Sequence, residues 1–440
     1  MSDVILHAFN WSYEEIENSA RAIRDAGYAA VLFPPPLYSD ERVATWWQRY
    51  QPKDYRILRS HLGNKAGLVR AVRAVREQRL FAYADIVFNH MANEALERSD
   101  TLDFPGARML ERYRDPAEGF ENDRLYGDLS EPLFDQRSFH PCRGIRDWLD
   151  MAEVSKCWLG ALPELTLSVW VIKQQLECLR ALNDLGFDGY RVDVIKPLPV
   201  HHIQSVFQNP ILKDKFVFGE LLTFNDAENE SLLWPVVRRS TLSFCDFPLQ
   251  QTLQRVFAPG GSLRELVNPS SSGEGLPWNR AVTFSVMHEV PNNDSCREML
   301  LSPIDEMLAN AYLLGREGGV PLIYSDHGES ARKYPEDAGR WSELWRRPDM
   351  LGMLAFHNEM AGKSQRCLFA QDGCIVLGRE TRGMLAINKT PETQHVALHQ
   401  HSLALGEYQC RLHGHRMTLN ADPFSLSIAP RSAQMWVWQR

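Results

Sequence analysis

Eight short apolar runs alternate with helical patterns over the first three quarters of this 440-residue chain, and this alternation constrains the fold most. Each run is almost continuously apolar, which is typical of parallel strands that are buried on both faces. Eight such strands separated by helices predict a closed (β/α)8 TIM barrel, with a doubly wound open sheet as the alternative from pattern alone. The predicted strands cover residues 4–9, 29–33, 80–88, 189–194, 216–221, 242–247, 281–287 and 320–324.

Three segments between these runs carry clear helix signals. One apolar stripe at helical spacing ends at Gly27, and a second covers residues 68–75. The longest stripe begins after Ser168, a residue type that caps helix amino termini, and stops at Gly186, the usual residue at a helix carboxyl end. These helices fit the connections that a parallel barrel requires.

Two stretches depart from the alternation. Residues 91–167 are rich in Asp, Glu, Arg and Pro, and this stretch is too long for a structureless loop in a compact domain. After residue 350, short β-type runs are broken by turn residues, as in an antiparallel sandwich. We therefore predict a barrel over residues 1–90 and 168–350, an inserted domain over 91–167 and a C-terminal β-sandwich over 351–440.

Charge and composition limit the classes of partner that the chain is expected to bind. The net charge is −8 and no basic run could neutralise several phosphates, so nucleic acid is not expected. No stretch of 18 apolar residues occurs, so no membrane partner is expected either. The amino terminus lacks the features of a secretory signal, and the eight cysteines are scattered without a CxxC pair. Both features predict free thiols and a cytoplasmic location.

Charged side chains stand where three predicted strands end, which is where catalytic groups of such barrels lie. Asp85 follows the third strand. In the fourth, strand alternation puts Arg191 and Asp193 on one face, so the guanidinium keeps the carboxylate ionised, as a nucleophile requires. A structural salt bridge is the alternative. Glu220 follows the fifth strand, either as a buried general acid or as a satisfied polar cap.

The residues at the ends of the third, fourth and fifth predicted strands form three motifs: Asp85-x-x-x-Asn89-His90, Gly189-x-Arg191-x-Asp193-x-x-Lys196, and Glu220 after an apolar strand. In this order and on these strands, they resemble the first three signatures of the α-amylase family (glycoside hydrolase family 13). Residues 49–55 and 160–165 are also similar to segments of that family, and the whole resemblance covers about residues 4–350.

The resemblance implies a retaining glycoside hydrolase that cleaves α-glucosidic bonds in maltooligosaccharides, α-glucans or small α-glucosides. Asp193 would be the nucleophile and Glu220 the general acid and base, with a covalent glucosyl-enzyme between the two steps. No cofactor is required for this chemistry. A transglycosylase or isomerase of the same family is the alternative, since it differs only in whether water or a sugar hydroxyl attacks the intermediate.

The same resemblance implies a set of substrate-binding side chains. His90 and His288 would hydrogen-bond sugar hydroxyls, and Tyr50 would stack on the sugar ring. Asp85 would support the floor of the site. The full predicted set is Tyr50, Asp85, His90, Arg191, Lys196 and His288.

The fourth family signature usually reads Asn-His-Asp, and here the sequence is Met287-His288-Glu289. The extra methylene of glutamate moves a carboxylate by roughly 1 Å, which costs on the order of 10²-fold in rate without compensation. Three interpretations stay open. Glu289 does the same job in a reshaped site, or the chain is a weakly active or inactive glycan-binding relative, or Asp294 takes the role.

A structural calcium is a further expectation from the resemblance. Glu164 and Asn89 stand where the family places calcium ligands, together with a backbone carbonyl that follows Lys196. Carboxylate, amide and carbonyl oxygens are the ligands that Ca²⁺ prefers. The alternative is that Asn89 only ties the barrel to the inserted domain.

Overall fold

The computed structural model describes residues 3–39, 44–95, 101–114, 118–141, 144–195 and 200–439. The chain divides into two compact units. The first comprises residues 1–7, 23–29 and 246–440, and the second comprises residues 8–22 and 30–245.

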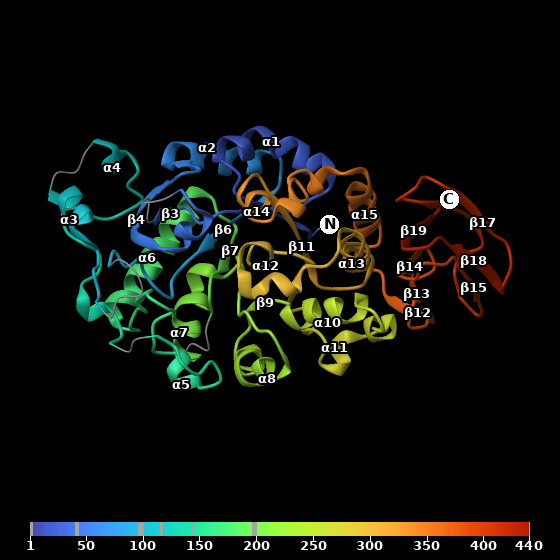
Figure 1. The fold of residues 1–440 in the computed structure, drawn as a ribbon. Coiled ribbons are helices and arrows are strands. Elements are labelled where there is room, and N and C mark those ends of the chain that lie inside the picture. The colour runs from blue at the N-terminus through green and yellow to red at the C-terminus, as the bar shows by residue number, and fades with distance from the viewer. Residues whose placement is uncertain are drawn as a thin grey trace. The chain divides into compact units, whose positions relative to one another are not determined.

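Eight parallel strands close into a barrel in the order β1-β11-β10-β9-β8-β7-β6-β2, which confirms the predicted fold class (Figure 1). Each of the eight predicted runs overlaps one of these strands, and β11 continues two residues beyond its predicted end. The first two are buried at every position, in keeping with their continuous apolar sequence. The barrel strands are β1 (Ile5–Phe9), β2 (Ala30–Phe33), β6 (Phe81–Ile86), β7 (Gly189–Val192), β8 (Phe216–Gly219), β9 (Ser243–Cys245), β10 (Ala281–Thr283) and β11 (Val320–Asp326).

Helices connect the strands, and the predicted caps of the longest one are confirmed. The Ser168 side chain accepts a hydrogen bond from the amide of Val171, and Gly186 adopts a left-handed φ of 106°. Among the described residues, no helix is both long and apolar enough to cross a membrane. The longer helices are α1 (Tyr13–Ala26), α2 (Lys65–Glu77), α6 (Val169–Leu185), α10 (Phe247–Phe257), α13 (Pro303–Gly315) and α15 (Pro348–Glu359). The shorter ones are α3 (Ala107–Arg114), α4 (Glu118–Asn122), α5 (Met151–Val154), α7 (Val200–His202), α8 (Asp226–Glu228), α9 (Trp234–Arg239), α11 (Pro269–Ser272), α12 (Glu289–Asn292) and α14 (Glu329–Lys333).

A small antiparallel sheet that the sequence patterns did not predict lies in the second unit. It contains β3 (Leu37–Ser39), β4 (Pro52–Ser60) and β5 (Gly63–Asn64). Strand β4 is almost entirely buried, although it carries six charged or hydroxyl side chains, PKDYRILRS. This polar composition hid the strand from a search for apolar runs.

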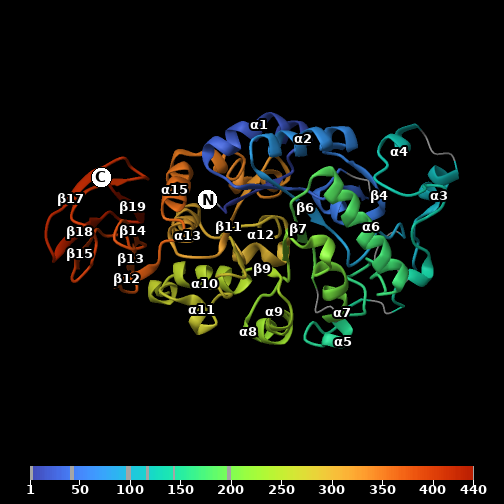
Figure 2. The ribbon, with the colours of Figure 1, turned by 180° about the vertical axis from the view of Figure 1, so that it is seen from behind.

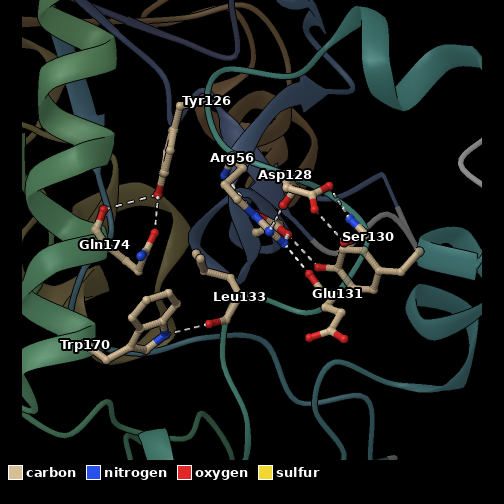
Figure 3. A network of polar contacts seen from close by, with 10 residues as sticks. Arg56, Tyr126, Asp128, Ser130, Glu131, Leu133, Trp170 and Gln174 are labelled. Carbon is tan, nitrogen blue, oxygen red and sulfur yellow. Dashed lines mark hydrogen bonds and ion pairs between the residues drawn. The ribbon is translucent and has the colours of Figure 1, made fainter.

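Polar contacts connect the inserted segment to its neighbours within the second unit (Figure 3). Arg56 in β4 donates hydrogen bonds to the backbone carbonyls of Asp128 and Glu131. The hydroxyl of Tyr126 donates to the backbone carbonyl of Gln174 in α6 at 3.2 Å. The segment is therefore held at both β4 and α6, while the bounds of an inserted domain at residues 91–167 stay a prediction.

Two antiparallel sheets form the C-terminal part of the first unit, as predicted (Figures 1 and 2). The predicted boundary at residue 351 falls inside α15, and its position stays a prediction. The six-stranded sheet has the order β12 (Gln365–Ala370), β13 (Cys374–Arg379), β14 (Gly383–Asn388), β19 (Ser432–Trp438), β16 (Gly406–Cys410) and β17 (Arg416–Leu419), and the second sheet pairs β15 (Gln394–Leu398) with β18 (Phe424–Ile428).

The cysteines only partly follow the prediction of free thiols. The prediction is wrong for Cys157, which is disulfide-bonded, because sequence spacing without a motif does not reveal which cysteines meet in the fold. Cys142 lies outside the described residues. The free cysteines are the exposed Cys367 and the buried Cys178, Cys245, Cys296, Cys374 and Cys410.

Candidate active site

Backbone pairing brings the carboxyl ends of β6, β7 and β8 into register. The amide of Asp193 donates to the carbonyl of Ile86 in β6 at 2.8 Å, and the amide of Glu220 donates to the carbonyl of Val192 in β7 at 2.9 Å. Since the strands are parallel, the side chains that follow their ends share one end of the barrel. The residues predicted from three separate motifs therefore lie together.

One buried guanidinium contacts three carboxylates. Nη1 of Arg191 donates to Oδ1 of Asp85 at 2.7 Å and to Oδ1 of Asp193 at 2.8 Å. Its Nη2 lies 2.6 Å from Oε2 of Glu220. All four side chains are at most 4% exposed. The predicted pairing of Arg191 with Asp193 is present, and the same cation also reaches the two other acids.

Asp85 forms the floor of this cluster. Burial raises the pKa of Asp85 to about 6, and the Arg191 guanidinium opposes that shift. The hydroxyl of Tyr50 donates to Oδ2 of Asp85 at 2.9 Å. Tyr50 closes the 3₁₀ turn Trp46–Tyr50, and its ring centre lies 5.5 Å from the guanidinium carbon of Arg191. Asp85 thus contacts both side chains, and its supporting role in the site stays a prediction.

His90 already contacts protein atoms through both ring nitrogens. Its Nε2 lies 2.9 Å from the carbonyl oxygen of Tyr50, and its Nδ1 lies 3.3 Å from the side-chain amide of Asn89. A hydrogen bond to a sugar hydroxyl requires one of these contacts to be exchanged. The sugar-binding role of His90 stays a prediction, as does that of Lys196, which lies outside the described residues.

The residues of the fourth motif belong to the first unit. His288 is fully buried, and its ring packs edge-on against His7 with ring centres 5.4 Å apart. Glu289 follows it, with Oε1 3.4 Å from Nε2 of His288 and a side chain that is 16% exposed. The Asp294 side chain is 85% exposed. The side chain of Glu289 is thus far less exposed than that of Asp294, and the catalytic role of Glu289 stays a prediction.

A polar network that the sequence patterns did not reveal holds the turn after β10. Nδ2 of Asn292 donates to the backbone carbonyl of His288 at 2.8 Å and lies 3.3 Å from the hydroxyl of Tyr324. Oγ of Ser330 donates to Oδ1 of Asn292 at 3.0 Å. The network fixes the backbone beside Glu289. The sequence indicates this network only through the spacing of four residues between His288 and Asn292. That spacing is informative only if a helix is already expected at these positions.

The proposed calcium ligands Asn89 and Glu164 lie on adjacent backbone. His90 and Glu164 form an antiparallel bridge, and the amide of Leu165 donates to the carbonyl of Asn89 at 3.0 Å. Both side chains are buried, and Oδ1 of Asn89 has no hydrogen-bond partner among the described residues. A buried amide oxygen without a donor, beside a buried carboxylate, fits a hard cation such as Ca²⁺.

Comparison with known proteins decides the family. No family model matches the chain. An α-amylase of Aeromonas hydrophila is 40% identical over 417 residues, which cover 93% of this chain and 89% of that protein. The chain belongs to the α-amylase family. This α-amylase family member is thus a glycosidase, and the three motifs on β6, β7 and β8 had predicted that family correctly.

Solved structures of the α-amylase family share the fold. α-Amylase I of Eisenia fetida matches with a TM-score of 0.75 at 19% identity, over 99% of this chain and 95% of that one. A variant of the Eisenia enzyme has been solved in complex with maltohexaose. A cyclomaltodextrin glucanotransferase with a three-domain ABC distribution matches with a TM-score of 0.72 at 18% identity, over 100% of this chain and 99% of that one.

Proposed function

We propose that this protein hydrolyses α-glucosidic bonds in maltooligosaccharides or α-glucans with retention of configuration. The observation that carries the proposal is the contact of one guanidinium, that of Arg191, with both Asp193 and Glu220. Retaining glycosidases need a nucleophile and an acid/base on opposite sides of one glycosidic bond, roughly 5–5.5 Å apart. The contact of both acids with one side chain supports a site in which they act on the same linkage.

The two oxygens of Glu220 differ in a way that suits proton transfer. Oε2 pairs with Arg191, whereas Oε1 is buried and has no hydrogen-bond partner among the described residues. In the first step, Glu220 protonates the leaving glycosidic oxygen while Asp193 attacks the anomeric carbon and forms a glucosyl ester. In the second, Glu220 takes a proton from water, which attacks the ester and releases glucose with Asp193 restored. Arg191 orients the Asp193 carboxylate throughout.

Product analysis on maltose through maltoheptaose tests the hydrolytic activity. We expect only shorter reducing oligosaccharides, because water attacks the glucosyl ester. The likeness to a cyclomaltodextrin glucanotransferase supports a second candidate, transglycosylation, which would give longer or cyclic products from the same covalent intermediate. Chromatography of early products separates the two, and longer products in excess of shorter ones would contradict hydrolysis as the main reaction.

Glu289→Asp tests whether the glutamate is adapted to its site. If Glu289 performs the transition-state role of the family's aspartate in a reshaped site, the shorter side chain should lower kcat/KM, but by less than loss of the charge does, because it withdraws the carboxylate by roughly 1 Å. Glu289→Gln is the matched control, and it should lose about 10²-fold or more because it lacks the charge. Activity that appears only in Glu289→Asp would mean that the natural chain is a glycan-binding relative without catalysis.

Two further assignments are proposals. Asn89 and Glu164 would hold a structural calcium and so tie the inserted segment to the barrel; the proposed chemistry does not require that ion. The cytoplasmic location stays a prediction from the sequence. The disulfide at Cys157 is an observation against it, because such bonds persist mainly in oxidising compartments.

A further inference from the structure

A pocket lined by polar and aromatic side chains lies within the first unit. It has a volume of about 390 Å³, which is within the range of small-molecule sites. An indole and several planar polar groups line it: Trp278, Asn268, Arg316, Glu317 and Gln365.

The backbone of Trp278 is fixed by its neighbours, whereas its side chain is largely exposed to solvent. Its side chain is 63% exposed, the largest value for any tryptophan among the described residues. Its carbonyl accepts a hydrogen bond from the amide of Gly319 at 2.9 Å. Gly318 lies so close that a Cβ there would stand 2.7 Å from Cβ of Trp278. An indole that is held in a fixed position and open to solvent offers an apolar face on which a ligand ring can stack.

Two of the polar side chains beside the indole are held in place by hydrogen bonds. The amide of Glu317 donates to Oε1 of Gln365 at 3.0 Å, and the amide of Gln365 donates to Oε2 of Glu317 at 2.6 Å. This reciprocal pair fixes both side chains at the rim. Asn268 is exposed and makes no side-chain capping bond to the short helix that follows it. Nε2 of Gln365 also donates to the backbone carbonyl of Val267 at 3.4 Å, so the planar groups that we expect to meet the hydroxyls of a sugar are those of Asn268, Arg316 and Glu317.

The pocket lies at the end of its strands that is remote from the proposed chemistry. Trp278 precedes the amino end of β10, and Gly319 directly precedes β11. Glu289, in contrast, follows the carboxyl end of β10. Arg316 and Glu317 lie between α13 and β11, and the remaining lining residues come from the neighbourhood of α11 and the start of β12, which Figures 1 and 2 label. A sugar bound here is therefore bound outside the catalytic centre.

We propose that this pocket, the Trp278 pocket, is a non-catalytic binding site for glucosyl units of polymeric α-glucan. The indole would stack on the apolar face of a pyranose, and the planar groups would hydrogen-bond its hydroxyls. The choice of glucosyl ligand rests on the proposed function. A polymer held at this site stays at a high effective concentration near the active site, whereas a short oligosaccharide gains nothing from it.

Trp278→Ala in a Glu220→Gln background tests the pocket without turnover. In native electrophoresis through gels that contain amylopectin, the apparent Kd should rise at least 5-fold against the Glu220→Gln parent. Phe81→Ala is the control, since Phe81 is also an exposed aromatic residue, 53% exposed, at the amino end of a barrel strand. It should bind amylopectin as the parent does. In the otherwise natural chain, Trp278→Ala should raise KM for amylopectin several-fold and leave kcat/KM for maltopentaose unchanged.

Cys367 provides a local readout, because it lines the pocket and is the exposed thiol among the free cysteines of the described residues. Maltoheptaose should slow the modification of Cys367 by a thiol reagent, followed by peptide mass spectrometry, in Glu220→Gln but not after Trp278→Ala. Unchanged amylopectin affinity of Trp278→Ala, or modification that maltoheptaose does not slow, overturns the proposal. Failure of the proposed function would instead show as absent hydrolysis of every glucan by the natural chain.

Discussion

Asp193→Ala should lower kcat/KM for maltooligosaccharides by at least about 10⁴-fold, the loss typical when a catalytic nucleophile is removed. The carboxylate lies 2.8 Å from Nη1 of Arg191 and is buried, so no water can take over its position as a charged nucleophile at comparable rate. Steady-state kinetics with maltopentaose as the substrate would measure this loss of kcat/KM. Unchanged thermal unfolding would show that the variant is folded.

Azide separates the role of Asp193 from that of Glu220. In Glu220→Ala, azide should attack the glucosyl ester and restore turnover of an activated α-glucosyl donor, with an α-glucosyl azide as product. In Asp193→Ala, azide can only replace the missing carboxylate, and the product should be the β-azide. Asp294→Ala is the control, because that side chain is 85% exposed, and its activity should stay within about 2-fold. More than a hundredth of natural activity in Asp193→Ala would refute the assignment.

Arg191→Met should destabilise the protein by about 3–5 kcal/mol at pH 8, because it leaves three buried carboxylates without their shared cation. The deficit should shrink at pH 5. Burial raises the folded-state pKa of Asp85 to about 6, against about 3.9 unfolded, and loss of the guanidinium raises it further. A carboxyl with a raised folded pKa favours the folded state at low pH, and this contribution is lost as pH rises through the folded pKa.

Urea unfolding at pH 5 and pH 8 measures both parts of this prediction. Arg70→Met is the matched control: Arg70 pairs with Glu17 at 3.1 Å, but its side chain is 59% exposed. That variant should lose under about 1 kcal/mol at either pH. A deficit for Arg191→Met that is equally small, or that does not depend on pH, would show that the guanidinium does not neutralise the cluster.

The sequence predicts the barrel well because parallel strands are buried on both faces and leave continuous apolar runs. It fails for β4, whose buried face carries Lys53, Asp54 and Arg56. Those side chains satisfy one another and the inserted segment, as the contacts of Arg56 with Asp54 and Glu131 show. The periodicity and hydropathy of a sequence do not show which charged side chains will pair in the folded chain.

The contacts of the candidate site were likewise predicted only in part. Alternation within one strand placed Arg191 and Asp193 on one face, and the contact is present. That the same guanidinium also reaches Asp85 and Glu220 depends on the register between strands, which a single sequence does not encode locally. The network around Asn292 and the disulfide at Cys157 likewise depend on contacts made only in the folded chain.

Trapping the covalent intermediate tests the central claim most directly. Glu220→Gln would be incubated with a fluorinated α-glucosyl fluoride, whose leaving group needs no proton and whose ester is hydrolysed slowly, and then digested for peptide mass spectrometry. We predict one glucosyl adduct, on the peptide that contains Asp193 and on that carboxylate. An adduct on Glu289, or no adduct in a preparation that still binds maltoheptaose, would contradict the account.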